Sequence, residues 1–265
     1  MTNPSSLHLI SVSNLSHSFG GLKAVSNFNL TVNKDDIWGI IGPNGAGKTT
    51  VFNLLTGVYR PDSGNVIYNG ENINGLPSHK IIGKGISRTF QNIRLFRSMS
   101  ILDNVRCGSY CRLGYPLWSA LFRSKTFSRM EGEQTARVKI LLDEFGLADR
   151  MLETAASLPY GLQRKVELAR ALASGPGLLL LDEPGAGMNP SELDGLADLI
   201  LRVKKQYGVA IILIEHRMQL VMRLCGRVKV LNFGETIFEG DPCGLAGNET
   251  VVKAYFGDDN GAFVN

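Results

Sequence analysis

Residues 42–49, Gly-Pro-Asn-Gly-Ala-Gly-Lys-Thr, decide the fold, because they fit the phosphate-loop pattern G-x-x-x-x-G-K-[S/T]. The loop follows Ile37–Ile41, an apolar run typical of a buried strand, and it precedes Thr50–Thr56, which can begin a helix. Glycines let the chain curl until successive backbone N–H groups face a phosphate, and the helix start adds positive potential. The sequence therefore predicts a phosphate-binding turn made of Gly42, Pro43, Asn44, Gly45, Ala46, Gly47, Lys48, Thr49 and Thr50.

Two residues of this loop carry specific chemistry. Lys48 would reach the β- and γ-phosphates of a nucleotide, and Thr49 would offer its hydroxyl to Mg²⁺. The alternative is a plain glycine-rich turn with a surface lysine. The flanking strand and helix patterns disfavour that alternative.

A second motif supplies carboxylates. The apolar run Leu178–Leu181 reads as a buried strand and ends in Asp182 and Glu183, at the strand end where open α/β sheets place ligands. Asp182 can hold Mg²⁺ through water, while Glu183 can orient or deprotonate an attacking water. Alone, the pair could simply be a strand exit. Together with the phosphate loop, it predicts a site for nucleotide hydrolysis.

Apolar runs of strand length alternate with helical patterns, which indicates a mixed α/β fold with a parallel sheet. Val66–Tyr68 leads into Asn69-Gly70, a pair suited to a tight hairpin. Strand patterns fade between residues 101 and 158, where Gln134–Phe145 has helical spacing, so we expect a helical insertion there. The other elements that we expect are Leu7–Val12, Phe28–Val32, Gln163–Ala173, Glu192–Gln206 and Val209–Ile214.

Composition limits the class of protein without choosing a ligand. The 265 residues include 28 Lys and Arg against 24 Asp and Glu, and this net charge of +4 does not demand a nucleic acid partner. The longest apolar runs are far shorter than the roughly 20 residues of a membrane-spanning helix. The N-terminus lacks the pattern of a secretion signal, and the four cysteines lack zinc or disulfide spacing. We expect a cytosolic protein with reduced thiols at Cys107, Cys111, Cys225 and Cys243.

These motifs resemble, in number, order and spacing, those of the ATP-binding subunits of ABC transporters over nearly the whole chain. Further matching features are Gln91 within Thr89–Asn92, the segment Leu158–Arg164, and His216 after Ile214-Glu215. Other features are similar to the branched-chain amino-acid uptake branch of the family. They are Phe19–Gly21, Arg88–Gln91, Arg94–Phe96, Gly187–Pro190 and Ile214–Met218.

The resemblance implies a role for each of these side chains around ATP and Mg²⁺. Phe19 would stack on adenine, an interaction of about 1–3 kcal/mol on protein aromatics. Gln91 would sense the γ-phosphate and Mg²⁺ and touch a membrane partner, and His216 would contact the γ-phosphate. Taken singly, these three residues would be read as ordinary core or surface residues, and only their joint spacing reverses that. The implied catalytic set is Glu183, His216 and Gln91, and the implied metal set is Thr49, Gln91 and Asp182.

One segment departs from the family pattern. The signature Leu-Ser-Gly-Gly-Gln is replaced here, so its serine hydroxyl and glutamine amide are absent. Pro159 is compatible with the first position of a helix, so the helix and its dipole are expected to survive. Losing one hydrogen bond to a charged group costs on the order of 1.5–3 kcal/mol, so one of two sites in a dimer would be weakened. The segment consists of Leu158, Pro159, Tyr160, Gly161 and Leu162.

The resemblance also implies an architecture. We expect a P-loop NTPase core of the RecA-like type, with an N-terminal antiparallel β subdomain and an inserted α-helical subdomain. One ABC ATPase domain would span residues 1–257, with 1–91 and 163–257 as the core and 92–162 as the insertion, followed by a loose tail, 258–265. The apolar stretch Leu113–Arg123 is expected to pack within the insertion or against a permease loop, although a lipid-facing surface is the alternative.

The implied partners are a second ATP-binding subunit in a head-to-tail dimer, expected to be a heterodimer, two integral membrane permeases and, indirectly, a substrate-binding protein. The chain would then act at the cytoplasmic face of a membrane, with no nucleic acid bound. Three alternatives stay open: an ABC ATPase for another cargo such as urea or lipid, a nucleotide-dependent switch in a soluble assembly, and a module that binds nucleotide without hydrolysis. Cargo and direction of transport do not follow from these residues.

Overall fold

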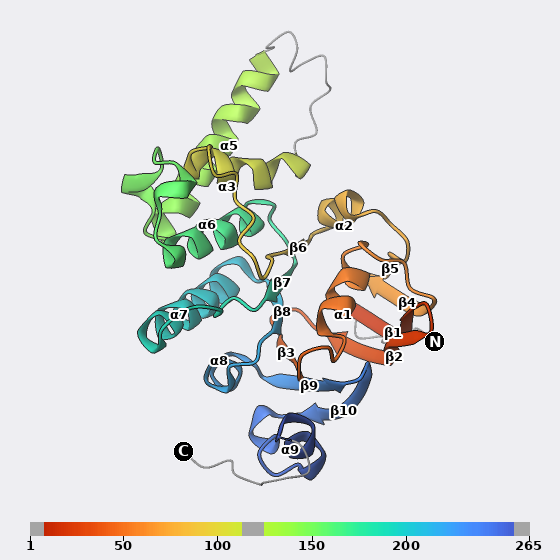
Figure 1. Cartoon of the computed structure of the whole chain (residues 1–265). Coiled ribbons are helices and arrows are strands. Elements are labelled where there is room, and N and C mark those ends of the chain that lie inside the picture. Colours follow the sequence, from red (N-terminus) through yellow and green to blue (C-terminus); the bar gives the residue numbers. More distant parts are fainter. Residues whose placement is uncertain (1–7, 113–124, 257–265) are drawn as a thin grey trace, which may run out of the picture.

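A six-stranded sheet with the order β10-β9-β3-β8-β7-β6 forms the centre of the protein (Figure 1). The computed structural model describes residues 8–112 and 125–256. Neighbouring strands from β9 to β6 pair in parallel, and only β10 joins this sheet in the antiparallel sense. The strands are β3 (Ile37–Ile41), β6 (Ile86–Arg88), β7 (Leu178–Asp182), β8 (Ala210–Ile214), β9 (Arg227–Asn232) and β10 (Glu235–Gly240).

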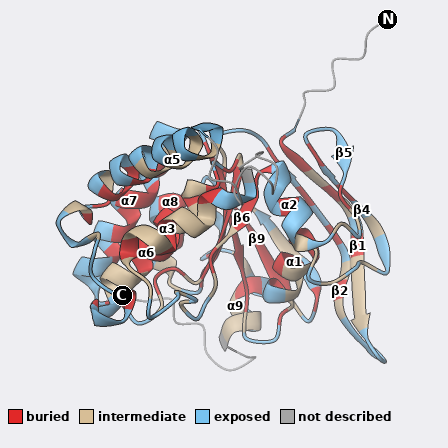
Figure 2. Ribbon diagram, turned by 90° about the horizontal axis from the view of Figure 1, so that it is seen from above, coloured by how far each residue is buried: buried red, intermediate tan, exposed pale blue. Residues whose placement is uncertain are grey.

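The central strands are apolar on both faces because each face covers a separate core. In β7, Leu179 and Leu181 pack into one cluster of buried residues, whereas Leu178 and Leu180 pack into the other. Ile211 and Ile212 of β8 divide in the same way. Side chains alternate along a strand, so a continuous apolar run is what a sheet covered on both sides requires. Figure 2 shows these strands as a buried layer between more exposed elements.

The second sheet is antiparallel, with the order β2-β1-β4-β5, and it forms one wall of the core that contains Leu178 and Leu180. Its strands are β1 (Ile10–Phe19), β2 (Leu22–Val32), β4 (Ser63–Tyr68) and β5 (Glu71–Asn72). Asn69 and Gly70 have φ values of 48° and 80°, as the predicted tight hairpin between β4 and β5 requires. Helix α1 (Lys48–Leu55) fills the space between the two sheets (Figure 1).

The other face of the central sheet is covered by helices. Helices α3 and α6 pack closely against each other, and α5 lies across them to form a helical region above the sheet (Figure 1). Helices α7 and α8 cover the lower part of this face. The helices are α2 (Ser78–Lys84), α3 (Ile101–Ser109), α5 (Lys125–Glu144), α6 (Tyr160–Ala173), α7 (Pro190–Tyr207), α8 (Met218–Leu224) and α9 (Glu249–Phe256), with short 3₁₀ turns at Tyr110–Arg112, Ala148–Arg150, Ala155–Ser157 and Pro242–Gly244.

The observed architecture confirms the predicted α/β class, the antiparallel β subdomain and the helical region between β6 and β7. The predicted bounds were too short in several places. Strand β2 begins at Leu22, not at Phe28, because it continues through a β-bulge, and helix α5 begins nine residues before Gln134. Elements α8, β9, β10 and α9 had no counterpart among the predictions.

One prediction about a helix start was wrong in detail. Pro159 does not occupy the first position of helix α6 but the N-cap before it, with an extended ψ of 151°. The segment Leu113–Arg123 and the tail 258–265 lie outside the described residues. Within residues 8–112 and 125–256, none of the helices combines the length and the apolar character needed to cross a membrane. All four cysteines are free thiols, and burial raises the pKa of Cys225 to about 12.

The close approach of helices α3 and α6 predicts the effect of adding one methyl group. A Cβ at Gly108 would lie 2.0 Å from the carbonyl oxygen of Arg170, so Gly108→Ala must push the helices apart. We expect it to lower the free energy of unfolding by about 2 kcal/mol, measured by urea denaturation. Gly132→Ala on α5 is the matched control, because no atom of the described residues lies within 4 Å of a Cβ there, and it should stabilise by about 0.5–1 kcal/mol. Equal effects of the two substitutions would contradict this account.

Candidate functional site

The phosphate loop curls between β3 and α1 as its glycines allow. Gly42, Gly45 and Gly47 all have positive φ, at 148°, 81° and 98°. A Cβ at Gly42 would lie 2.1 Å from the carbonyl oxygen of Leu231, and one at Gly47 would lie 2.3 Å from that of Ala24. Both positions therefore need glycine for space as well as for conformation.

Lys48 folds back over this loop. Its Nζ donates hydrogen bonds to the carbonyl oxygens of Gly42 and Pro43, at 2.7 and 2.8 Å, and the side chain is buried. Burial lowers its pKa, and the nearby carboxylates Glu183 and Asp182 oppose that shift only in part. The ammonium group is thus held against the backbone of the loop. Of the remaining loop residues, Asn44, Gly45 and Thr49 are exposed, Ala46 is buried, and Pro43 and Thr50 are half-buried.

Strand β7 delivers two carboxylates with different surroundings. Asp182, its last residue, is 3% exposed, whereas Glu183 stands just outside the sheet. Glu183 has a φ of 46°, a strained conformation for a residue with a long side chain, and its amide donates to the Ile214 carbonyl at 2.9 Å. The backbone thus fixes the direction of the Glu183 side chain before any ligand binds.

Gln91 and His216 converge on Glu183. The Gln91 Nε2 donates to Glu183 Oε2 at 2.9 Å, and His216 Nδ1 lies 3.9 Å from the same oxygen. Gln91 follows strand β6, and His216 follows strand β8. Three residues predicted from distant parts of the sequence are therefore brought together at one carboxylate.

Glu215, which sequence analysis did not single out, organises this edge. It is fully buried, and its carboxylate accepts hydrogen bonds from the backbone N–H groups of Gly185 at 2.9 Å, His216 at 2.9 Å and Arg217 at 3.1 Å. The carboxylate joins the turn after β7 to the turn after β8. In the sequence, Glu215 is a single acidic residue at the end of an apolar run. Nothing in that pattern distinguishes a buried acceptor of backbone hydrogen bonds from an ordinary surface glutamate.

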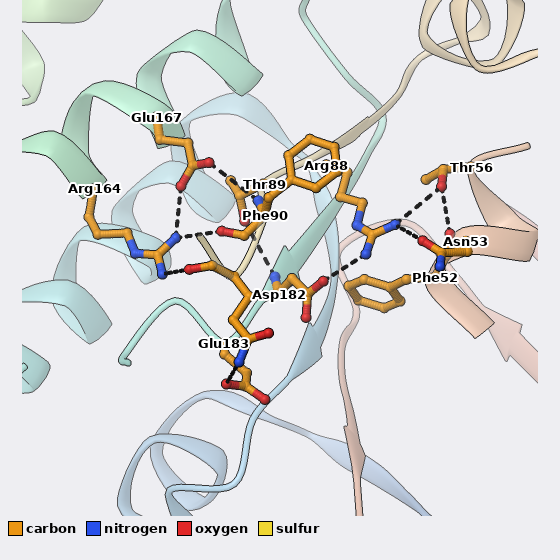
Figure 3. Close-up of polar contacts among 11 residues, drawn as sticks. Phe52, Asn53, Thr56, Arg88, Thr89, Phe90, Arg164, Glu167, Asp182 and Glu183 are labelled. Carbon is orange, nitrogen blue, oxygen red and sulfur yellow. Dashed lines mark hydrogen bonds and ion pairs between the residues drawn. The ribbon is translucent and has the colours of Figure 1, made fainter. Parts of the chain in front are cut away.

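A second residue to which sequence analysis assigned no role is Arg88, the last residue of β6. Its Nη2 forms an ion pair of 2.7 Å with Asp182 Oδ2, and its Nη1 donates to Asn53 Oδ1 at 2.7 Å (Figure 3). The guanidinium lies over the rings of Phe52 and Phe90, with its central carbon 5.3 and 5.1 Å from their centres. Both members of the ion pair are almost completely buried.

A third is Arg164 of helix α6, which holds the chain at Gln91. It donates to the carbonyl oxygens of Phe90, at 2.6 Å, and Gln91, and it pairs with the buried Glu167 at 2.8 Å (Figure 3). It also reaches the Tyr160 hydroxyl at 3.1 Å. One guanidinium thus joins the start of α6 to the backbone that carries Gln91.

The segment Leu158–Leu162 does not reach the phosphate loop of its own chain. Within residues 8–112 and 125–256, none of its hydrogen bonds ends on residues 42–50. Leu158 is buried, while Tyr160 is 44% exposed. Whatever this segment contacts through its exposed face is therefore not the nucleotide loop beside Glu183.

Phe19 ends strand β1 and is 46% exposed. The ring meets Tyr59 and His17 edge to face, with ring centres 5.2 and 4.7 Å apart. Strand β2, which pairs with β1, passes the phosphate loop at Ala24. An exposed aromatic face in this neighbourhood is suited to stacking on a planar base.

The donors around the loop suit a metal only together with a phosphate. Among the described residues, no group of three or more His, Cys, Asp or Glu side chains is arranged to hold a metal ion. The predicted metal set offers one hydroxyl, one amide oxygen and one carboxylate, from Thr49, Gln91 and Asp182. Mg²⁺ typically takes one or two protein ligands and completes its shell with phosphate oxygens and water.

A glycine loop at a helix start, beside an acid pair at the end of the adjoining parallel sheet, defines a nucleotide-binding protein of the P-loop class. The sequence model of the ABC transporter family matches residues 25–186. The chain belongs to this family and carries its ATPase domain.

Comparisons with known proteins agree with this assignment. The chain is 42% identical to the high-affinity branched-chain amino acid transport ATP-binding protein BraF of Pseudomonas aeruginosa, over 94% of this chain and 98% of that one. It is 41% identical to LivG of Escherichia coli K12, of the same description, with the same coverage. The lipopolysaccharide export system ATP-binding protein LptB of Haemophilus influenzae is 31% identical over 95% of this chain and 98% of that one.

Solved structures give the same fold. A nucleotide-free ATP-binding cassette from an ABC transporter superposes with a TM-score of 0.83 at 29% identity, covering 95% of this chain and all of that one. An ATP-binding cassette in its ADP conformation also gives 0.83, at 30% identity, covering 96% of this chain and all of that one. The P-loop ATPase fold predicted from the sequence is confirmed.

Proposed function

We propose that this chain is the ATP-hydrolysing subunit of an ABC importer, and that it couples Mg²⁺-dependent ATP hydrolysis to uptake of branched-chain or related amino acids through separate permeases. The convergence of Gln91 and His216 on the strained Glu183, beside the phosphate loop, is the observation that carries the catalytic part. The cargo rests on the names of BraF and LivG, which cover nearly the whole chain.

In this proposal the residues of the site divide nucleotide binding, metal binding and hydrolysis among them. The backbone N–H groups of the loop 42–50, to which Pro43 contributes none, bind the β- and γ-phosphates together with Lys48, and Phe19 stacks on the adenine. Thr49, Gln91 and Asp182 hold Mg²⁺, which would neutralise phosphate charge when bound. Glu183 orients the attacking water toward the γ-phosphate and accepts its proton, with Gln91 and His216 fixing that carboxylate.

The signature segment supports a head-to-tail dimer. It lies apart from the phosphate loop of its own chain, so a second ATP-binding subunit would have to bring a signature to this loop. Since Pro159 lacks the serine hydroxyl, a heterodimer with a complete signature on the other subunit would have one weakened site, the one facing Pro159. Among the described residues, no side chain caps the start of α6, and the dipole of the helix is retained there.

A hollow beside Gln91 supports contact with a permease. It has a volume of about 420 Å³ and lies between the central sheet and helices α3 and α6, lined by Phe90, Arg94, Phe96, Cys107 and Arg170 among others. Phe96 is 53% exposed. A large apolar side chain at the mouth of a hollow is suited to a partner's helix. The position of the chain at the cytoplasmic face of the membrane follows from such contact.

The domain organisation is part of the same proposal. Residues 1–257 would act as one ATPase domain, with 92–162 as a helical unit that moves against the core formed by 1–91 and 163–257, and with 258–265 as a tail. A substrate-binding protein would act through the permeases only.

An ABC ATPase for another cargo is the second candidate. The likeness to the lipopolysaccharide export protein LptB favours it, because an ATPase subunit does not touch the cargo and its fold is shared between cargo classes. A soluble nucleotide switch or a module that only binds nucleotide remains an outcome of the tests below.

Isolation of the assembly tests the transport proposal directly. We expect the tagged chain, extracted from its native membrane in mild detergent, to retain integral membrane subunits and a second ATP-binding subunit. Recovery of soluble partners alone would contradict transport. The identity of the co-isolated binding protein or permease would separate amino-acid uptake from another cargo.

Glu183→Gln tests the catalytic assignment. It should leave ATP affinity within about threefold, while ATP hydrolysis by the assembled complex falls by at least about 100-fold, because the amide cannot accept the proton of water. Calorimetry measures binding and phosphate release measures turnover. Glu192→Gln, in the capping box of α7, is the control for loss of one carboxylate and should keep turnover. Unchanged ATP turnover in the Glu183→Gln variant would contradict the assignment of Glu183 as the residue that acts on the attacking water.

Pro159→Ser tests the weakened site. Restoring the hydroxyl at the N-cap should raise the ATPase or transport rate of the assembled complex, because a serine there can contact a facing phosphate or cap helix α6. Thermal unfolding of the isolated chain separates the capping effect, which needs no partner. Identical rates in complexes that contain the unaltered chain and in complexes that contain the Pro159→Ser variant would show that the departure is silent.

A further inference from the structure

Arg88 and Asp182 form a buried ion pair at the carboxyl ends of strands β6 and β7. Asp182 is the carboxylate assigned to Mg²⁺, yet a fixed cation already holds its Oδ2 at 2.7 Å (Figure 3). Its side chain is 5% exposed, and that of Arg88 is 6% exposed. An ionised carboxylate this deeply buried needs a compensating charge in every state of the protein, including the state without nucleotide.

The position of Arg88 is over-determined, which suits a permanent rather than a transient contact. Its Nη1 is fixed by Asn53 of helix α1, and two aromatic rings, Phe52 and Phe90, flank the guanidinium (Figure 3). The buried Nε finds no acceptor among the residues that the structure describes. The guanidinium is thus oriented to contact Asp182 and Asn53, although this orientation leaves its Nε–H without an acceptor among the described residues.

The geometry leaves part of Asp182 available. Within the described residues, its Oδ1 accepts no hydrogen bond, while Oδ2 is taken by Arg88. Lys48 acts on the carboxylates through space, but its own hydrogen bonds go to the loop carbonyls. Arg88 is therefore the cation in direct contact with Asp182.

We propose that Arg88 is a resident counter-ion, a positioning residue that neutralises Asp182 in the nucleotide-free chain and holds it with Oδ1 directed to Mg²⁺ when MgATP binds. This rests on the metal role proposed for Asp182. The same guanidinium joins three elements that meet at the nucleotide: helix α1 after the phosphate loop, strand β6 before Gln91, and strand β7. The bound metal and Arg88 then share one carboxylate.

A stability cycle without metal or nucleotide tests the counter-ion. Arg88→Met leaves Asp182 unpaired, and we expect the midpoint of thermal unfolding to fall by roughly 10 °C. In the double variant Arg88→Met/Asp182→Asn, neither charge of this pair is left without its partner, so about half of that loss or more should return. Additive losses would overturn the proposal. If Arg88→Met alone yields no folded chain, the double variant decides: recovery of folded protein supports the counter-ion, and failure to fold contradicts it.

Lys229→Met provides the matched control. Lys229 is a buried cation that pairs with Glu239, and within the described part of the chain it forms no ion pair or hydrogen bond with the nucleotide-site side chains. The loss of stability caused by Lys229→Met should simply add to the change caused by Asp182→Asn. Rescue of Lys229→Met by Asp182→Asn would mean that the recovery is a general effect of removing charge, and it would overturn the proposal.

ATP affinity in EDTA and in MgCl₂ gives a readout that packing alone would not move. Without Arg88, metal-free ATP would face an uncompensated Asp182, whereas Mg²⁺ would supply the missing positive charge. The ratio of the ATP Kd in EDTA to that in Mg²⁺ should therefore rise several-fold in Arg88→Met and less in Arg88→Lys, which keeps the charge. An unchanged ratio would contradict the proposal. If calorimetry detects no ATP binding by the unaltered chain, the proposed function is contradicted. The thermal-unfolding cycle without metal or nucleotide would still test whether Arg88 is the counter-ion of Asp182.

Discussion

Parallel pairing of four strands is the constraint on which the site depends. Strands β3, β6, β7 and β8 all run in one direction, so their carboxyl ends lie along a single edge of the sheet. The phosphate loop follows β3, Gln91 follows β6, Asp182 and Glu183 end β7, and His216 follows β8. Residues that are up to 174 positions apart in the chain, from 42 to 216, thereby meet without any loop having to reach across the molecule.

Burial on both faces makes that edge rigid. Each central strand divides its side chains between two cores, one beneath the antiparallel sheet and one beneath the helices. Neither face can shift without opening a core, so the ends of the strands are fixed in relation to one another. The strain at Glu183 and the buried carboxylate of Glu215 persist because this frame holds them.

Two buried arginines, Arg88 and Arg164, connect the carboxyl edge of the central sheet to the helices beside it. Their contacts could not be predicted from the sequence. The phosphate loop and the acid pair have short sequence patterns whose residue types indicate their chemistry. The core strands can be predicted because they are continuous apolar runs. Arg88 and Arg164 have no such pattern, because an arginine in a sequence is most often on the surface. Only packing shows that their charges are buried and which carboxylates and carbonyls they hold.

The sequence by itself determined the phosphate loop, the two-sided central strands and the Asn69-Gly70 hairpin, since each depends on residue type and spacing over short distances. It also determined the family, through the number, order and spacing of motifs along nearly the whole chain. The tertiary structure decided the convergence of Gln91 and His216 on Glu183, the separation of Leu158–Leu162 from the loop, and the pairing of Arg88 with Asp182. These depend on sheet order, which joins Gln91 to Glu183 across 92 positions of the chain and Arg88 to Asp182 across 94. No local pattern encodes such contacts, because their residues meet only once the sheet has formed. For Arg88 and Asp182, the energy of the pair also arises only when both side chains leave water together.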